Sequence, residues 1–413
     1  MGSLERHPPM QEVEIFENNS WSCVHAGLER GVARPLRAAL DWLRDTLAGR
    51  FEEKAREFLK DTWTARDEYI DVVRDGSPAS QSSFLNRHAA HALNDAERVT
   101  ALNLLELQRH LMLMYTSCGC FFDEISGIER VQVIQYACRA VQLSQEVLGN
   151  HVESEFLQAL AQAKSNLPEQ GDGAAIYRKS ASPAAVNLER LAAYYAISSL
   201  FKAYPEHARV YCYSADRVDQ RSMDAGQMRL GLGSARFTSE ITLESQQLVY
   251  GALHFGDHNL NCGIRVFRDA ESDQKLVEEI SAAFSRADIP EVLRLMDKKL
   301  SPVYSLNRDD RRAILEQILR PSLEEAEAAY NQIYERHVPL AHFLRDIGSP
   351  LPKAIRTAAE FALNIHLRRA FEASLGDRCG RDPQLMDETR TSGIALESTT
   401  LEYALRRKYR TFV

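Results

Sequence analysis

The feature that most constrains the fold is a pair of long apolar helical patterns, over residues 96–115 and 129–149, separated by a short irregular stretch. Apolar residues recur at helical spacing in the first pattern and predict a broad buried face that includes Leu102, Leu105, Met112 and Leu113. We expect Asp95 to cap the start of the first helix and Gly149 to end the second. Two long helices joined by a tight turn favour an antiparallel bundle.

Further helices are expected on both sides of this pair. A helix opens at Pro35 and carries leucines at helical spacing, namely Leu36, Leu40, Leu43 and Leu47. Residues 165–185 are rich in Gly, Pro and Ser and are interpreted as a linker or surface loop, and a helix over about 186–201 follows. From Ser272 onward the pattern is helical again, and five prolines are expected to mark helix boundaries, namely Pro302, Pro321, Pro339, Pro350 and Pro352.

The period changes over residues 208–268, where β-forming residues alternate with polar ones. This pattern predicts a small antiparallel sheet. The expected fold class is mainly α, a helical bundle with a small antiparallel β-domain inserted, and α+β overall. The domains expected are an extended segment over residues 1–34, the bundle over 35–205, the β-domain over 206–270 and a helical region over 271–413.

Charge and composition exclude several classes of protein. The formal charge is −8, which argues against a nucleic-acid partner, because proteins that bind nucleic acids usually present a basic face. No apolar run approaches the roughly 20 residues that span a bilayer, so we expect no membrane partner. Residues 1–11 are polar and predict no signal peptide. Seven scattered cysteines suit reduced thiols, so we expect a cytoplasmic protein.

Two short motifs invite a chemical interpretation. Cys118 and Cys120 flank a glycine and could suggest a metal with His110 nearby, but no second ligand pair accompanies them, so we expect no metal and no cofactor. Asp257 and His258 could act together as acid and base. Without a nucleophile, this pair is more often a turn with a satisfied histidine.

The stretch from Phe121 to Glu124 places two aromatic rings beside two carboxylates. Ring faces stack on sugars and carboxylates accept hydrogen bonds from hydroxyls, and glycosidases use paired carboxylates in catalysis. The alternative is two core phenylalanines, with Asp123 and Glu124 capping the next helix. On the residues alone, this second interpretation is favoured.

The segment HLMLMYTSCGCFFDEISGIERVQVIQYACRAVQL, residues 110–143, resembles the C-terminal region of bacterial glycoside hydrolase family 57-like proteins, known as domain of unknown function 3536. The stretches EVEIFENNSWSCVH, FTSEITLES and LHFGDHNLNCGIR agree with it in the same order, and the resemblance runs from about Glu12 to Phe371. In that family a barrel at the N-terminus carries the two catalytic carboxylates. The resemblance implies that this chain starts after the barrel and carries no catalytic residue.

The resemblance also implies where a sugar would bind, because the family's helical region packs on the barrel and completes its cleft. The substrate-binding candidates are Trp21, His25, Tyr115, Ser117, Cys120, Phe121, Phe122, Asp123 and Glu124, with Asp257 and His258 as weaker candidates. The family has Trp where this chain has Cys120, which removes a stacking ring.

Three functions are therefore carried forward. The first is a non-catalytic accessory region whose partners are a family 57-like barrel and an α-glucan or oligosaccharide. The second is a stand-alone carbohydrate-active enzyme that uses Asp123 and Glu124, or Asp257 and His258. The third is a purely structural or interaction protein. Measurable hydrolysis by the chain alone would favour the second.

Overall fold

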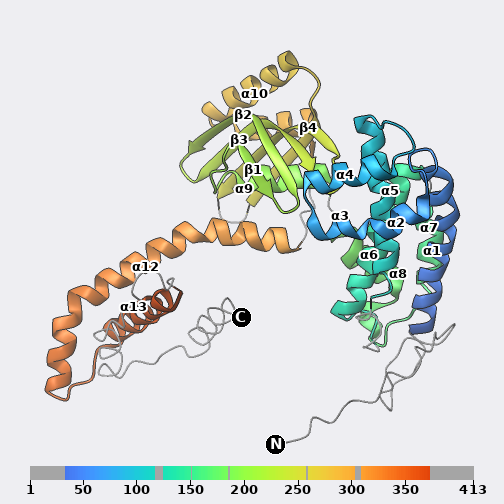
Figure 1. The fold of residues 1–413 in the computed structure, drawn as a ribbon. Coiled ribbons are helices and arrows are strands. Elements are labelled where there is room, and N and C mark those ends of the chain that lie inside the picture. Colours follow the sequence, from blue (N-terminus) through green and yellow to red (C-terminus); the bar gives the residue numbers. More distant parts are fainter. Residues whose placement is uncertain are drawn as a thin grey trace, which may run out of the picture. The chain divides into compact units, whose positions relative to one another are not determined.

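The computed structural model describes residues 33–116, 124–149, 151–184, 187–256, 259–302 and 308–372. The chain divides into two compact units, Met1–Arg312 and Ala313–Val413. The first unit combines a helical bundle with one antiparallel sheet, so the expected α+β class is confirmed. Figure 1 shows the bundle and the sheet side by side within this unit.

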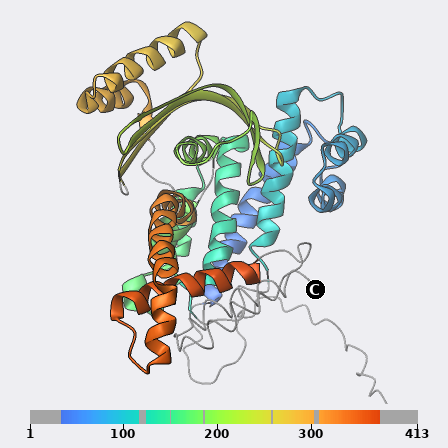
Figure 2. The same cartoon turned by 90° about the vertical axis from the view of Figure 1, so that its left-hand side faces the viewer.

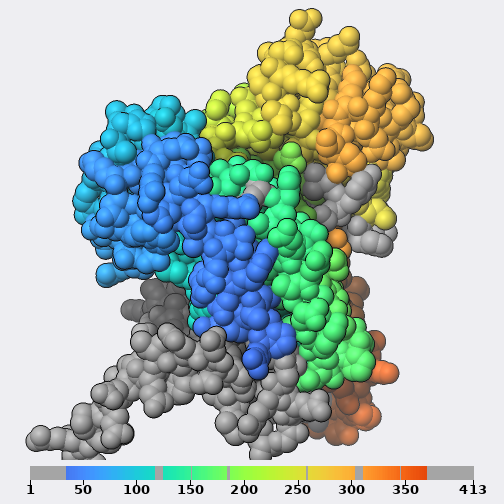
Figure 3. Space-filling model, turned by 90° about the vertical axis from the view of Figure 1, so that its right-hand side faces the viewer, coloured from blue at the N-terminus to red at the C-terminus, as the bar shows by residue number. Residues whose placement is uncertain are grey.

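The bundle is built from four helices, α1 (Ala33–Ala55), α5 (Asp95–Leu113), α6 (Ile128–Leu148) and α7 (Glu153–Leu160). The four leucines predicted on α1 are all fully buried in a core shared with α5, α6 and α7. Figure 3 shows the surface of α1, in blue, running beside the green surface of residues 151–184. Burial of an apolar stripe from each helix therefore holds the bundle together.

Three shorter helices, α2 (Thr62–Glu68), α3 (Ile70–Asp75) and α4 (Pro78–His88), form a second core against one end of α1 and α5. Phe51, Phe84 and Leu105 lie in this core. The bundle thus carries two adjoining apolar clusters, of which the second supports the start of α5.

The ends of the two long helices follow local capping rules. Gly149 ends α6 in the left-handed conformation at φ 62°, which confirms its predicted role. The predicted cap at Asp95 is wrong, because Asn94 is the capping residue and Asp95 is the first helical residue. The Asn94 side chain accepts from the backbone of Glu97, and the Glu97 carboxylate accepts from the backbone of Asn94. This reciprocal pair satisfies two otherwise unpaired donors.

The predicted linker over residues 165–185 is wrong over most of its length. It contains four short helical turns, η2 (Pro168–Gln170), α8 (Gly173–Ile176), η3 (Tyr177–Ala181) and η4 (Ser182–Ala184). Ile176 and Tyr177 are buried in the bundle core, and the Tyr177 hydroxyl donates to Glu153 at 2.9 Å. The Gly and Pro residues favour the turns, whereas the apolar residues between them pack into the bundle core.

The sheet has six antiparallel strands in chain order, β1 (His207–Val210), β2 (Tyr213–Ala225), β3 (Met228–Ser239), β4 (Ser245–Gly256), β5 (Asn259–Val266) and β6 (Ser301–Pro302). Helix α9 (Leu188–Ser198) packs on one face, where Tyr195 contacts the rings of Phe237 and Tyr250. Helices α10 (Ala270–Ser285) and α11 (Ile289–Lys299) cover the other face. In Figure 2 the sheet arches over α9.

Two strand glycines make room for one leucine on the face of the sheet that α10 and α11 cover. A Cβ at Gly263 would lie 2.7 Å from Cβ of Leu300, and one at Gly251 would lie 2.9 Å from its Cδ1. Leu300 is 3% exposed and closes the core under α11. The absence of side chains at the two glycines therefore allows this close approach.

The second unit contains most of α12 (Arg308–Asp346) and all of α13 (Lys353–Glu372). Pro350 and Pro352 lie between these helices, as predicted, but Pro321 and Pro339 lie inside α12, so their predicted role as boundaries is wrong. Proline removes one backbone donor and bends a helix without always ending it. Figure 1 shows the bend in α12.

Candidate functional site

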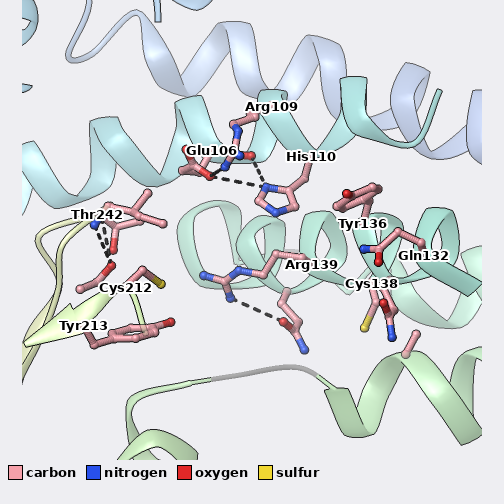
Figure 4. A pocket seen from close by; sticks show the side chains of 15 residues that line it. Glu106, Arg109, His110, Gln132, Tyr136, Cys138, Arg139, Cys212, Tyr213 and Thr242 are labelled. Atoms are coloured by element: carbon pink, nitrogen blue, oxygen red, sulfur yellow. Dashed lines mark hydrogen bonds and ion pairs between the residues drawn. The ribbon is translucent and has the colours of Figure 1, made fainter. Parts of the chain in front are cut away.

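A cavity of about 310 Å³ lies in the first unit, where α5 and α6 meet two turns at one end of the sheet. Glu106, Arg109 and His110 come from α5, and Arg139 of α6 reaches into the space between them and the strands (Figure 4). The turn between β1 and β2 contributes Cys212, and the turn between β3 and β4 contributes Thr242. The walls of the cavity thus come from the bundle and from the sheet.

Glu106 is a buried carboxylate whose oxygens are both engaged within the protein. Oε1 accepts a hydrogen bond from the hydroxyl of Tyr69 at 2.9 Å. Oε2 accepts one from Arg109 at 2.9 Å and lies 3.7 Å from Nδ1 of His110. A buried carboxylate needs such partners because its desolvation is costly. Glu106 therefore organises the neighbouring side chains.

His110 presents one defined nitrogen to the cavity. Its Nδ1 lies 2.8 Å from the backbone carbonyl oxygen of Glu106, and a carbonyl can only accept, so Nδ1 carries the proton. Burial lowers the pKa of His110, although the Glu106 carbonyl and carboxylate oppose that shift. The ring is thus neutral near pH 7, and Nε2 is a hydrogen-bond acceptor. The ring of Tyr136 stands edge-on to it, with centroids 6.2 Å apart.

The α6 wall contains three amides and one guanidinium, beside the Tyr136 ring and the Cys138 thiol. Arg139 pairs with Glu146 at 3.4 Å and donates to the Gln142 amide oxygen at 3.5 Å. Gln132 and Gln135 line the same wall. Each amide offers both a donor and an acceptor, so this wall suits a ligand with hydroxyl groups.

The opposite wall is a tight turn fastened to the bundle. Ser239 Oγ accepts from the backbone of Thr242 at 3.1 Å. The Gln81 side chain of α4 donates to the carbonyls of Glu240 and Ile241 at 2.7 and 3.3 Å. Hydrogen bonds from both sides thus hold the turn in place over the cavity.

The cavity thiols and the Tyr213 phenol are not activated. Burial raises the pKa of Cys138 and of Cys212, and it raises the pKa of Tyr213 to about 12. These groups stay protonated at neutral pH, and a thiol is a nucleophile only as the thiolate. They therefore act as lining and as weak donors.

Tyr115 is one of two predicted site residues that the structure describes. Its hydroxyl donates to Asp41 at 2.7 Å, and the guanidinium groups of Arg37 and Arg44 lie 5.0 and 5.4 Å from the ring centroid. Burial, with the Asp41 hydrogen bond, raises the pKa of Tyr115. The phenol is thus held against α1.

Glu124 is the other one, and it fastens a loop. Its carboxylate accepts from the backbone of Ser126, from the Ser165 hydroxyl and from the backbone of Asn166, at 2.9, 2.6 and 2.8 Å. Partial burial alone would raise the pKa of Glu124, but these hydrogen bonds hold it below its ordinary value. The other predicted site residues lie outside the described residues, namely Trp21, His25, Ser117, Cys120, Phe121, Phe122, Asp123, Asp257 and His258.

The sequence interpretation missed the cavity between α5, α6 and the sheet. Its signal is a polar stripe on α6, formed by Gln132, Gln135, Tyr136, Arg139 and Gln142 at helical spacing. Such a stripe is ordinarily a solvated face. Only the fold shows that two turns of the sheet cover it.

Within the described part of the chain, no group of three or more His, Cys, Asp or Glu side chains could hold a metal ion. The same residues contain no helix long and apolar enough to cross a membrane.

The family described as domain of unknown function (DUF3536) matches residues 33–308. The chain belongs to the DUF3536 family. The match starts at the first described residue and ends four residues before the boundary of the first unit, so the bundle, the sheet and the cavity are the DUF3536 region. No curated protein and no solved structure gives a significant match to the chain.

Proposed function

We propose that this DUF3536 region is a non-catalytic carbohydrate-binding region that works beside a separate catalytic barrel in the cytoplasm of a bacterium. The observation that carries the proposal is the cavity lining, which combines amides, hydroxyls, guanidinium groups and two tyrosine rings. The resemblance to glycoside hydrolase family 57-like proteins supplies the barrel as the partner.

A sugar suits this cavity in both chemistry and size. Its hydroxyls can donate to His110 Nε2 and to amide oxygens, and they can accept from amide nitrogens and from Arg139. The rings of Tyr136 and Tyr213 offer apolar surface for the C–H face of a pyranose. The volume of about 310 Å³ lies near the lower end of ligand pockets, roughly 300–1,000 Å³. We therefore assign a ligand of one or two sugar rings.

The state of Glu106 supports binding without catalysis. Glycoside hydrolysis generally uses two carboxylates, about 5–10 Å apart, of which one donates a proton and the other attacks or activates water. Glu106 is the one carboxylate among the cavity-lining residues that the structure describes, and both of its oxygens are engaged. This arrangement orients neighbours and leaves the reaction to a partner domain.

Docking of the barrel is supported by apolar surface at one end of the bundle. Ile128 begins α6 and is 80% exposed, and Met112 near the end of α5 is 49% exposed. Leu167 belongs to the loop that Glu124 fastens at this end and is also exposed. Exposed apolar residues that gather at one end indicate an interaction site. Docking here would bring the barrel next to Tyr115 and Glu124.

Calorimetric titration of the purified chain with glucose, maltose and maltotriose tests sugar binding. We expect saturable binding that weakens at least tenfold in Gln132→Leu. The matched control Gln274→Leu, at an exposed position of α10, should bind like the parent chain. Unchanged affinity in Gln132→Leu would refute the site, and the absence of binding to all three sugars would refute the function.

The same preparation is assayed for hydrolysis of starch and aryl α-glucosides. We expect no turnover. Turnover that copurifies with the chain and is lost in Glu124→Gln would show that the chain is itself an enzyme.

A further inference from the structure

The helix α12 carries an exposed apolar seam with a seven-residue repeat. Leu319, Ala326, Ile333 and Leu340 recur at intervals of seven, and Ile347 follows at the same interval just after the last residue of the helix. Leu315, Ala329 and Phe343 occupy three of the five intervening positions, and Ser322 and Arg336 occupy the other two. The six large members are all exposed, from 42% for Ile333 to 60% for Phe343. The seam runs over 33 residues and is contained in the second unit.

The contacts of α13 leave this seam open. Tyr334 and Val338 of α12 pack against a small cluster on α13 that contains Ala362 and Leu363. The rings of Tyr330 and Phe361 lie 4.6 Å apart. Glu327 is joined to Arg369 at 2.5 Å. Helix α13 therefore packs on other residues of α12 than those of the seam.

A repeat of seven is specific for pairing with another long helix. A straight helix has 3.6 residues per turn, so a strict repeat of seven drifts by about 20° per heptad and needs a partner that coils with it. One repeat position is apolar throughout and the second is apolar in three of its five residues, which is the pattern of a coiled coil with two polar core positions. We propose that α12 pairs with α12 of a second copy of this chain, in antiparallel orientation.

Antiparallel pairing about residue 331 makes the seam complementary to itself. Leu315 then lies opposite Ile347 of the partner subunit, and Leu319 opposite Phe343 of the partner subunit. At the centre, Ile333 meets the small Ala329 of the partner subunit, and Arg336 meets Ala326 of the partner subunit. Large residues thus face each other at the ends, and each large residue at the centre faces a small one, as close packing requires.

Charge and helix shape agree with this register. Exposed Glu324 and Glu325 come to lie beside Arg336 and His337 of the partner subunit, which joins an acidic segment to a basic one. In a parallel pair, each acidic segment would lie against its own copy. The antiparallel register also brings Pro321 near Pro339 of the partner subunit, so the two bent regions coincide.

Sedimentation of the full chain tests the association. We expect the mass of two chains for the parent protein, and the mass of one chain for both Ile333→Glu and Phe343→Glu. Ile70→Glu is the matched control, because Ile70 is an exposed apolar residue on α3 in the other unit. A monomeric parent chain at all micromolar concentrations would overturn the proposal, as would dimers that survive both seam substitutions.

The orientation is tested by charge reversal and by cross-linking. Glu325→Arg and Arg336→Glu should each weaken the dimer at least tenfold, and their combination should restore it. Leu319→Cys chains mixed with Phe343→Cys chains should form a disulfide between the two variants. Leu319→Cys alone should not add a disulfide, because 24 residues of helix separate its two copies by about 36 Å. A disulfide that joins two Leu319→Cys chains through the introduced thiols would overturn the antiparallel register.

Discussion

The hydroxyl of Tyr69 donates a 2.9 Å hydrogen bond to Oε1 of Glu106, 37 residues further along the chain. Tyr69 lies between α2 and α3 and belongs to the core of the short helices, whereas Glu106 faces the cavity. The bond therefore connects the support of α5 to the position of Arg109 and His110.

We expect Tyr69→Phe to destabilise the first unit by about 1–3 kcal/mol, because it leaves a buried carboxylate oxygen without its donor. Urea unfolding of Tyr69→Phe, Glu106→Gln and the double variant forms a cycle. The two changes should be coupled by at least about 0.5 kcal/mol, since both residues share one hydrogen bond. Additive effects would show that the bond contributes nothing to stability.

The stability of the protein should fall as the pH drops below about 6.5, in part through His110. Burial lowers the folded-state pKa of His110, so the unfolded chain binds the proton more readily. The contribution of His110 to stability is complete above its pKa in the unfolded chain, and it is lost as the pH falls through its pKa in the folded protein. Urea unfolding between pH 5 and pH 8 should show a shallower pH dependence for His110→Gln.

The packing of Leu300 against two glycines predicts a compensating pair of substitutions. Gly263→Ala places a methyl group 2.7 Å from Cβ of Leu300 and should destabilise by about 1–3 kcal/mol. Leu300→Ala opens a cavity and should cost about 2–5 kcal/mol. The double variant should be less destabilised than the sum of the two, as measured by chemical unfolding. If the two changes in the free energy of unfolding are fully additive, the methyl group added at residue 263 does not contact Leu300.

The sequence predicted those elements whose signal is local. The leucines of α1 and the β-forming residues of 208–268 identified a bundle and a sheet, although β3 and β4 are buried in continuous runs and not at alternate residues. Met112 shows the limit of that signal, because it was expected on a buried face and is 49% exposed. The end of a helical stripe turns away from the core when the neighbouring helices end or diverge.

The cavity could not be predicted because it depends on contacts between distant segments. Gln81 and Glu240 are 159 residues apart, and their hydrogen bond fixes the turn that covers α6. Pro321 and Pro339 were misinterpreted for a related reason, since a proline marks a bend and only the surrounding structure decides whether the helix continues. Tyr115 and Glu124 were selected as sugar-binding candidates, and the structure shows that the Tyr115 hydroxyl is bonded to Asp41 and the Glu124 carboxylate to the loop at Ser165.

The hydrogen bonds from Gln81 to the β3–β4 turn also place the cavity between two separate apolar cores. One core lies in the bundle, and the other lies between the sheet and helices α10 and α11. A ligand that contacts both walls of the cavity would link the bundle to the sheet. Its binding free energy would then oppose every opening motion that separates bundle from sheet, while motions inside either core would be unaffected. Ligand binding in the cavity would thus change how rigidly the bundle and the sheet move together.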